Sequence, residues 1–275
     1  MQKNYGKLLD SIRPYGRAAV AFSGGADSAL VCYAAAEALG KDNVLCLTAR
    51  AAVFPENEIN DAKIFCQTNN IRHEVVEFDV FGVEGFSENP PDRCYICKRG
   101  LFSMLIDVAD KAGFAAVFDG TNIDDEKDYR PGMRAVTELG VISPLRKAGL
   151  AKDGIREISG WLGLATRDKE SGPCLASRFV YGEGITAEKL DMIKQAEDFL
   201  RRGGCKAIRV RIHGTDSYTA RIEVQPGEIK RLAEEPLRGE IADYFKGLGF
   251  SYVTLDLTGY RMGSMNEVLP ENTGF

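Results

Sequence analysis

The segment from Ser23 to Ser28, Ser-Gly-Gly-Ala-Asp-Ser, has the residue types of a pyrophosphate-binding loop. It follows an apolar stretch at 18–22, and a helical pattern begins directly after it. Small residues let a backbone turn sharply and approach a ligand, and N–H groups that open a helix attract anions. Ser23 and Ser28 add hydroxyl donors, and Asp27 adds a carboxylate suited to Mg²⁺. A Walker A loop is excluded, because no Lys-Ser or Lys-Thr pair follows the second glycine.

Three cysteines form a second candidate centre. Cys94 and Cys97 lie in Arg-Cys-Tyr-Ile-Cys-Lys, and Cys174 lies in Gly-Pro-Cys-Leu-Ala-Ser-Arg. Zinc would need a fourth ligand from a second pair, and a redox disulfide would need a thioredoxin-like setting. Three thiolates instead suit a [4Fe–4S] cluster with one open iron. An incidental C-x-x-C remains an alternative, and the residues leave open whether Cys174 is a ligand or a nucleophile.

The elements that must position these residues alternate along the first part of the chain. Strand patterns at 18–22, 43–48, 73–78 and 114–119 are separated by helical patterns at 26–39, 56–69 and 95–112. This alternation predicts an α/β fold with a parallel sheet and helices on both faces. Ligands of such sheets bind at the carboxyl ends of the strands. We therefore expect three polar segments, 23–28, 48–50 and 119–122, to converge on one rim.

The pattern changes near residue 180, after a stretch rich in glycine. A helix is predicted at about 186–202, and strands at 208–212, 220–224 and 252–257 indicate a smaller α+β unit. We predict two domains, 1–180 and 181–275.

Bulk properties limit the class of protein. The chain has 275 residues, 44% of them apolar, and a formal net charge of −5. It has no apolar run of about 18 residues and no apolar stretch of a signal peptide at the N-terminus, so we expect a cytoplasmic protein without a membrane span. The acidic balance argues against a nucleic acid partner. Cys32, Cys46 and Cys66 lie in apolar patterns and are predicted to be core residues.

Six motifs together resemble the LarE family of ATP-dependent sulfur transferases, which belongs to the PP-loop ATP pyrophosphatase superfamily. They cover nearly the whole chain and lie at 23–28, 93–98, 119–125, 172–178, 209–214 and 259–266. The first motif is specific to the superfamily. The Cys174 motif, taken with the pair Arg209 and Arg211, is specific to the family.

The resemblance implies a first stage in which ATP activates a carboxylate. A carboxylate of pyridinium-3,5-biscarboxylic acid mononucleotide attacks the α-phosphate, pyrophosphate leaves, and an acyl-adenylate forms. Mg²⁺ is expected at Asp27. Residues expected at the nucleotide are Ser23, Gly24, Gly25, Asp27, Ser28, Thr48, Arg50, Asp119, Thr121 and Asn122.

The second stage implied by the resemblance is displacement of AMP by sulfur. In one version the residue matching Cys174 gives up its own sulfur and becomes dehydroalanine. In the other, three cysteines hold [4Fe–4S], and the open iron carries the sulfide that is donated. Sacrificial members have only the last cysteine, whereas this chain has Cys94, Cys97 and Cys174, so we favour the cluster version.

The resemblance also implies a site for the substrate nucleotide. Arg209 and Arg211 match a pair that holds a phosphate of this substrate, and alternate residues of a strand point to the same face. Arg178 is expected at the sulfur site, and Glu223 matches an acidic residue near it. Family members form hexamers, so a homo-oligomer is expected.

Three other functions share parts of this pattern. A PP-loop tRNA thiolation enzyme would need a surface for RNA. An amidating enzyme such as an NAD synthetase would leave the three cysteines unexplained. A nucleotide-binding module without turnover would bind ATP but release no pyrophosphate.

Overall fold

The computed structural model describes residues 1–127, 131–169, 172, 174–261 and 264–266. Pro173 of the Cys174 motif and residues 262–263 of the C-terminal motif lie outside the described residues. Contacts along the chain define two compact units. The first unit comprises Met1–Val83 and Cys94–Gly172, and the second comprises Glu84–Arg93 and Pro173–Phe275.

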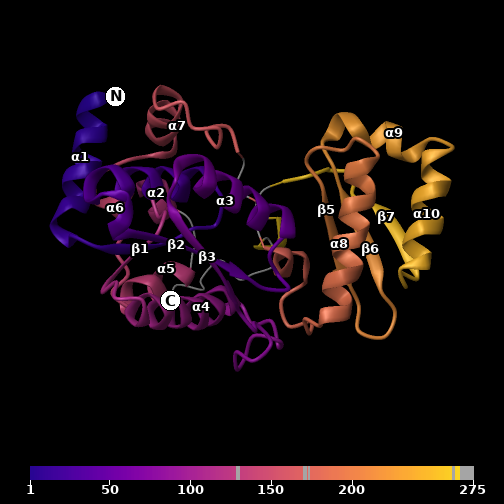
Figure 1. Ribbon diagram of the computed structural model, residues 1–275. Helices are drawn as coiled ribbons and strands as arrows, with labels where there is room; N and C mark the ends of the chain where they lie inside the picture. Colours follow the sequence, from indigo (N-terminus) through magenta and orange to yellow (C-terminus); the bar gives the residue numbers. More distant parts are fainter. Residues whose placement is uncertain (128–130, 170–171, 173, 262–263, 267–275) are drawn as a thin grey trace. The chain divides into compact units, whose positions relative to one another are not determined.

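The first unit is built on a four-stranded parallel sheet in the order β3-β2-β1-β4 (Figure 1). Its strands are β1 Ala18–Ala21, β2 Val44–Arg50, β3 Arg72–Glu77 and β4 Ala116–Phe118. Its helices are α1 Gln2–Ile12, α2 Ala26–Leu39, α3 Glu56–Asn69, α4 Arg93–Lys111, α5 Pro131–Glu138, α6 Pro144–Lys147 and α7 Lys152–Trp161. This arrangement confirms the predicted α/β fold, and α2 and α3 have the predicted limits.

Both faces of this sheet are buried, which explains its nearly continuous apolar strands. Val20 of β1 is in register with Cys46 and Phe118, and these side chains pack with α1, α2, α3 and α7 on one face. One residue earlier, Ala19 and Leu45 point to the opposite face, where they pack with α4 and α5. Figure 1 shows the two helical layers on either side of the strands. The rigid sheet fixes where each strand ends, and thus where the polar loops begin.

The second unit contains a smaller sheet in the order β5-β6-β7. The strands are β5 Arg209–His213, β6 Thr219–Glu223 and β7 Tyr252–Leu255, and the helices are α8 Ala187–Arg202, α9 Ile229–Ala233 and α10 Leu237–Gly247. β5 and β6 are antiparallel, whereas β6 and β7 are parallel. The α+β pattern expected after residue 180 is present.

The second unit also includes the segment 84–93, which precedes α4 in the sequence. Asn89 donates from its side-chain amide to the carbonyls of Val180 and Glu183, and Ile185 donates its N–H to the carbonyl of Ser87. Local periodicity of the sequence does not predict these hydrogen bonds, because they join segments that are far apart in the chain. The domains predicted at 1–180 and 181–275 stay a prediction, and the compact units differ from them by this segment and by the residues from 173 to 180.

No helix among the described residues is long and apolar enough to cross a membrane. Cys32 and Cys46 are fully buried and Cys66 is nearly so, as predicted for core residues.

Candidate active site

The loop from Ser23 to Ser28 connects the carboxyl end of β1 to the first turn of α2. The hydroxyl of Ser28 accepts a hydrogen bond from the N–H of Ser23 at 3.3 Å and donates to the carbonyl of Gly25 at 3.2 Å. The first bond of the helix runs from Ala29 N–H to Gly25 O. The N–H groups that precede it have no carbonyl of an earlier helical turn to bond, and no side chain caps them at Gly25. The loop therefore presents donors and a positive helix end to an anion.

Glycine is required at position 24 for two separate reasons. Gly24 has a φ of +75°, in the region that L-residues with side chains rarely adopt. A Cβ at this position would also lie 2.8 Å from the carbonyl oxygen of Glu58 in α3. The loop is consequently pressed against α3, and its turn is set by packing as well as by backbone freedom.

The loop after β4 reaches the same place. A Cβ on Gly120 would lie 2.9 Å from the backbone nitrogen of Ser28, so these two loops are in close contact. Asn122 donates from its side-chain amide to a carboxylate oxygen of Asp27 at 3.1 Å. Asp119 accepts bonds from the N–H and the hydroxyl of Thr121, which shape this loop. Two of the three polar segments therefore meet, and Asp27 is held in one orientation.

The third segment, at the end of β2, bonds through Thr48 to the residue that precedes the first segment. The buried hydroxyl of Thr48 donates to the carbonyl of Phe22 at 2.8 Å and lies 2.8 Å from Nε2 of His73. Because its proton is used on Phe22, it accepts from His73, which assigns the hydrogen to Nε2. Burial lowers the pKa of His73, so the imidazole is neutral near pH 7. The Thr48 hydroxyl therefore holds Phe22, the residue before the phosphate loop. A contact between Thr48 and the nucleotide stays a prediction.

Arg50 ends β2 at the same sheet edge. Its guanidinium pairs with Glu77 at 2.7 Å and with Glu56 at 3.2 Å, and about a third of the side chain is exposed. Arg50 is thus paired with acids from β3 and α3. Its predicted role at the nucleotide is untested by this geometry.

Cys94 and Cys97 lie in the first turn of α4, which begins at Arg93 rather than at the predicted residue 95. Residues three apart on a helix lie on the same face, so the two thiols project to one side. Cys94 is exposed and Cys97 is half-buried. Both belong to the first unit, whereas Cys174 belongs to the second. Within either unit, the described residues bring together no group of three His, Cys, Asp or Glu side chains that could hold a metal.

The segment that carries Cys174 is anchored by Arg178. Nη1 of Arg178 donates to the Cys174 carbonyl at 3.1 Å and to the Ser177 hydroxyl at 2.9 Å. Its other two nitrogens bind the Glu197 carboxylate in α8 at 2.8 and 2.9 Å, and this ion pair is buried. Glu197 also accepts from the N–H of Val210 in β5 at 3.0 Å. The half-buried Cys174 is therefore positioned by a buried ion pair that joins its loop to the second sheet.

A second buried ion pair involves predicted substrate residues. Arg211 binds both carboxylate oxygens of Glu223, at 3.1 and 2.8 Å, and donates to the carbonyl of Ser177 at 2.9 Å. Glu223 is fully buried and is also 3.3 Å from Arg221 and 3.1 Å from the hydroxyl of Ser264. In this state Glu223 orients two arginines and does not present a group to solvent. Phosphate binding by Arg211 stays a prediction.

Arg209 has different surroundings from Arg211. Its guanidinium stacks on the ring of Tyr260, 4.9 Å from the ring centre, and donates to the hydroxyl of Tyr260 at 3.4 Å. Among the described residues it forms no ion pair with a carboxylate. Burial, followed by the charge of Arg178, lowers the pKa of Arg209. An incompletely compensated cation in a partly buried position is suited to an anionic ligand.

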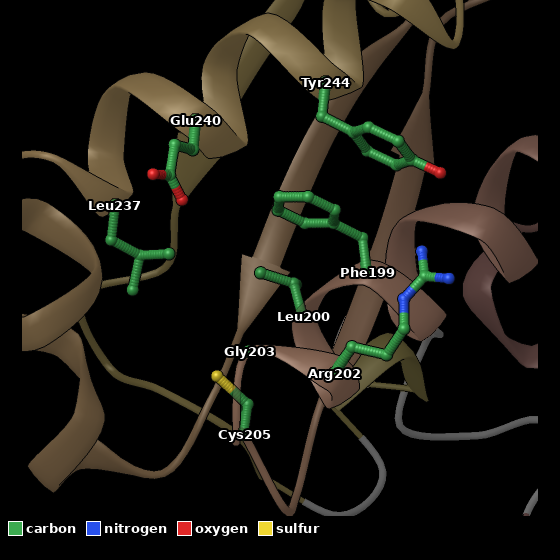
Figure 2. A pocket seen from close by; sticks show the side chains of 8 residues that line it. All are labelled: Phe199, Leu200, Arg202, Gly203, Cys205, Leu237, Glu240 and Tyr244. Carbon is green, nitrogen blue, oxygen red and sulfur yellow. The ribbon is translucent and has the colours of Figure 1, made fainter.

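A cavity of about 380 Å³ lies elsewhere in the second unit, between α8 and α10 (Figure 2). Phe199 and Tyr244 stack in it with ring centres 4.3 Å apart, and Cys205 lies at its edge. It contains none of the predicted site residues. Besides these rings and aliphatic side chains, its lining includes the charged residues Arg202 and Glu240.

Three residues of this arrangement were not singled out from the sequence. Gly120 packs against the phosphate loop, Glu197 holds Arg178, and Lys169 lies beside Gly24. In the sequence, Glu197 has the pattern of a polar residue of an amphipathic helix. No local signal distinguishes it from the other polar residues of that helix. For Gly120 a signal was available, because a glycine directly after a buried parallel strand marks a close backbone approach.

Comparison with known proteins gives three findings. A family model described as NAD synthase matches residues 11–88, which include the phosphate loop. The pyridinium-3,5-bisthiocarboxylic acid mononucleotide synthase of Lactiplantibacillus plantarum is 35% identical over 95% of this chain and 93% of its own length. A protein of Synechocystis described as uncharacterized is 42% identical over 92% of this chain and 93% of its own length.

Proposed function

Given that this chain belongs to the LarE family of ATP-using sulfurtransferases within the PP-loop superfamily, we propose that it transfers sulfur to a carboxylate of pyridinium-3,5-biscarboxylic acid mononucleotide through an acyl-adenylate. The observation that carries the ATP-dependent step is the loop from Ser23 to Ser28. It combines the N–H groups of a helix N-terminus that no side chain caps with the oriented carboxylate of Asp27. The Lactiplantibacillus relative, matched over nearly the whole chain, supports the substrate.

In the first stage the phosphate loop stabilises charge that develops on the leaving pyrophosphate. The N–H groups at the start of α2 and the hydroxyl of Ser23 are the donors for this charge. Asp27 fits Mg²⁺, because its carboxylate supplies the hard oxygen ligands that this metal prefers and Asn122 helps to orient it. When bound, the metal neutralises phosphate charge. Because a carboxylate oxygen is a poor leaving group, activation as the adenylate is what allows a sulfur nucleophile to displace it.

In the second stage we propose that Cys94, Cys97 and Cys174 hold a [4Fe–4S] cluster. Thiolates are the ligands that such clusters require, and the helical pair places two of them on one face of α4. Bound in this way, the cluster would supply an open iron for the sulfide that is donated. Arg178 and Glu197 keep the Cys174 loop in place and are positioning residues. Direct donation of the Cys174 sulfur is the alternative source.

Further expectations accompany this proposal. We propose that Arg209 and Arg211 bind the phosphate of the substrate nucleotide. The partly buried and incompletely compensated charge of Arg209 supports this role. A cytoplasmic location, a homo-oligomer and the absence of a nucleic acid partner stay predictions.

Cysteine variants test the two stages separately. Protein prepared without oxygen is given ATP, Mg²⁺ and the biscarboxylic substrate, and pyrophosphate and the thiocarboxylate product are both measured. We expect Cys174→Ala to abolish the thiocarboxylate and to retain substrate-dependent pyrophosphate release. Cys205→Ala removes a thiol from the same unit and is the matched control, expected to retain both activities. Loss of pyrophosphate release in a folded Cys174→Ala protein would show that the two stages are not separable.

The sulfur source is resolved by the mass of the protein after turnover. With a cluster, the anaerobic protein contains iron and sulfide, makes more than one product per chain and keeps its polypeptide mass. Cys94→Ala and Cys97→Ala then lose sulfur transfer along with the iron. A single turnover with loss of one sulfur from Cys174 would instead establish the sacrificial route and overturn the cluster proposal.

A further inference from the structure

A lysine lies beside the phosphate loop although the loop motif itself contains none. Nζ of Lys169 is 3.5 Å from the position that a Cβ on Gly24 would take. It is held there by the carboxylate of Asp61 in α3, at a distance of 2.7 Å. Both residues belong to the first unit, and the Lys169 side chain is 23% exposed.

Described residues before and after Lys169 in the sequence contact other parts of the first unit. The N–H of Lys169 bonds to the carbonyl of Thr166 at 3.1 Å in a turn after α7. Gly172, three residues on, packs so closely on the carboxylate of Glu58 that a Cβ there would collide with it. Since Glu58 also touches Gly24 through its carbonyl, Gly172 and the phosphate loop pack on the same residue of α3. The packing of the first unit on α3 therefore places the Lys169 ammonium group beside the phosphate loop.

A bound triphosphate needs positive charge at this place. In a Walker A loop a lysine of the motif reaches the β- and γ-phosphates, whereas here the corresponding motif contributes an acid, Asp27. We propose that Lys169 binds the phosphates of ATP and that Asp61 holds its ammonium group beside the loop until the nucleotide arrives. This inference rests on the proposed function, because it deepens the ATP site of that same reaction.

Lysine suits such a role because its compact charge is carried on a flexible stem. A small rotation of the terminal bonds transfers the ammonium from one oxygen anion to another without movement of the backbone. The competing interpretation is a surface ion pair, which contributes little to stability and nothing to binding. The two interpretations differ in what removal of the Lys169 ammonium group does to ATP binding.

The experiment compares Lys169→Met, Lys169→Arg and Asp61→Asn with wild type. Binding of ATP with Mg²⁺ is measured by calorimetry, and kcat and KM for ATP are measured from substrate-dependent pyrophosphate release. Lys41→Met is the matched control, because Lys41 bonds the carbonyl of Asn69 at the opposite end of α3. Thermal unfolding of each variant shows whether it is folded.

We expect Lys169→Met to reduce kcat/KM for ATP by about 10- to 100-fold, the scale of one lost charge-assisted hydrogen bond, and Lys169→Arg to recover most of it. Asp61→Asn should leave ATP affinity unchanged or tighten it, because it removes a competitor for the ammonium. Equal losses in Lys169→Met and Asp61→Asn, or no loss in Lys169→Met, overturn the inference. If the wild-type protein neither binds ATP nor releases pyrophosphate, both the proposed function and this inference are wrong. If the wild-type protein binds ATP and Lys169→Met binds it equally well, only the role of Lys169 is refuted.

Discussion

Glu197→Gln should weaken the second unit far more than an ordinary surface change. The Glu197 and Arg178 side chains are 3% and 4% exposed, and the carboxylate also binds the N–H of Val210. Removing one partner of a buried ion pair leaves an uncompensated charge, which costs about 3–5 kcal/mol. The amide of glutamine keeps one acceptor for Arg178 or Val210, so we expect a loss near the lower limit.

The neighbouring residue provides the control. Asp198 pairs with Arg201 on the exposed side of the same helix, and both side chains are about half exposed. Surface pairs of this kind contribute about 0–1 kcal/mol, so Asp198→Asn should change little. Because the single tryptophan of the chain, Trp161, lies in the first unit, its fluorescence does not report on this region. The appropriate assays are urea unfolding followed by circular dichroism and amide hydrogen exchange of peptides that cover β5.

Activity separates a positioning role from a purely structural one. Since Arg178 holds the Cys174 carbonyl, Glu197→Gln should slow sulfur transfer while pyrophosphate release continues. The double variant Arg178→Met with Glu197→Leu removes both charges of this pair, so it should recover much of the stability but not the sulfur transfer. If Glu197→Gln changes stability no more than Asp198→Asn does, or if the double variant regains full transfer, our assignment of this pair is wrong.

Two further predictions concern the fold and its pH dependence. Gly120→Ala should lower the free energy of unfolding by about 1–3 kcal/mol, because its Cβ would lie 2.9 Å from the nitrogen of Ser28 and one loop must move. Gly6→Ala in α1 meets no atom within 4 Å and should be neutral or stabilising, and equal urea midpoints for these two variants would contradict the packing argument. Burial lowers the pKa of both His73 and His213 below the ordinary value of 6.5. The unfolded chain therefore binds protons at these residues more readily than the folded protein does. We expect the free energy of unfolding to fall as the pH decreases through 6.5. Urea unfolding at pH 7.5 and 5.5 measures this change. Between these pH values the double variant His73→Gln with His213→Gln should lose less stability than wild type. A wild-type protein that is more stable at pH 5.5 than at pH 7.5 would refute the expected direction of the change.

Local pattern was sufficient for the four strands of the first sheet and for α2 and α3, whereas α1, α5, α6 and α7 were not predicted from it. The limits of α2 and α3 follow from apolar spacing and from Gly40 and Asn70, which end the two helices. The parallel sheet follows from alternation of strands and helices, and the phosphate loop from its small residues between β1 and α2. Motif resemblance identified the family, because the spacing of reactive residues is visible in the chain itself.

The partners of the charged residues were decided by the tertiary structure alone. Arg211 could be placed on a strand face from the sequence, but its commitment to Glu223 depends on the register of β5 with β6. Likewise Lys169 reaches the phosphate loop only because two loops share one wall of α3. The spacing of apolar residues in the sequence indicates which face of its own helix or strand a residue lies on. An ion pair depends instead on the distance between two elements that are far apart in the chain. The sequence thus determined the chemistry available to this protein, and the packing of its elements determined which groups are held together to perform it.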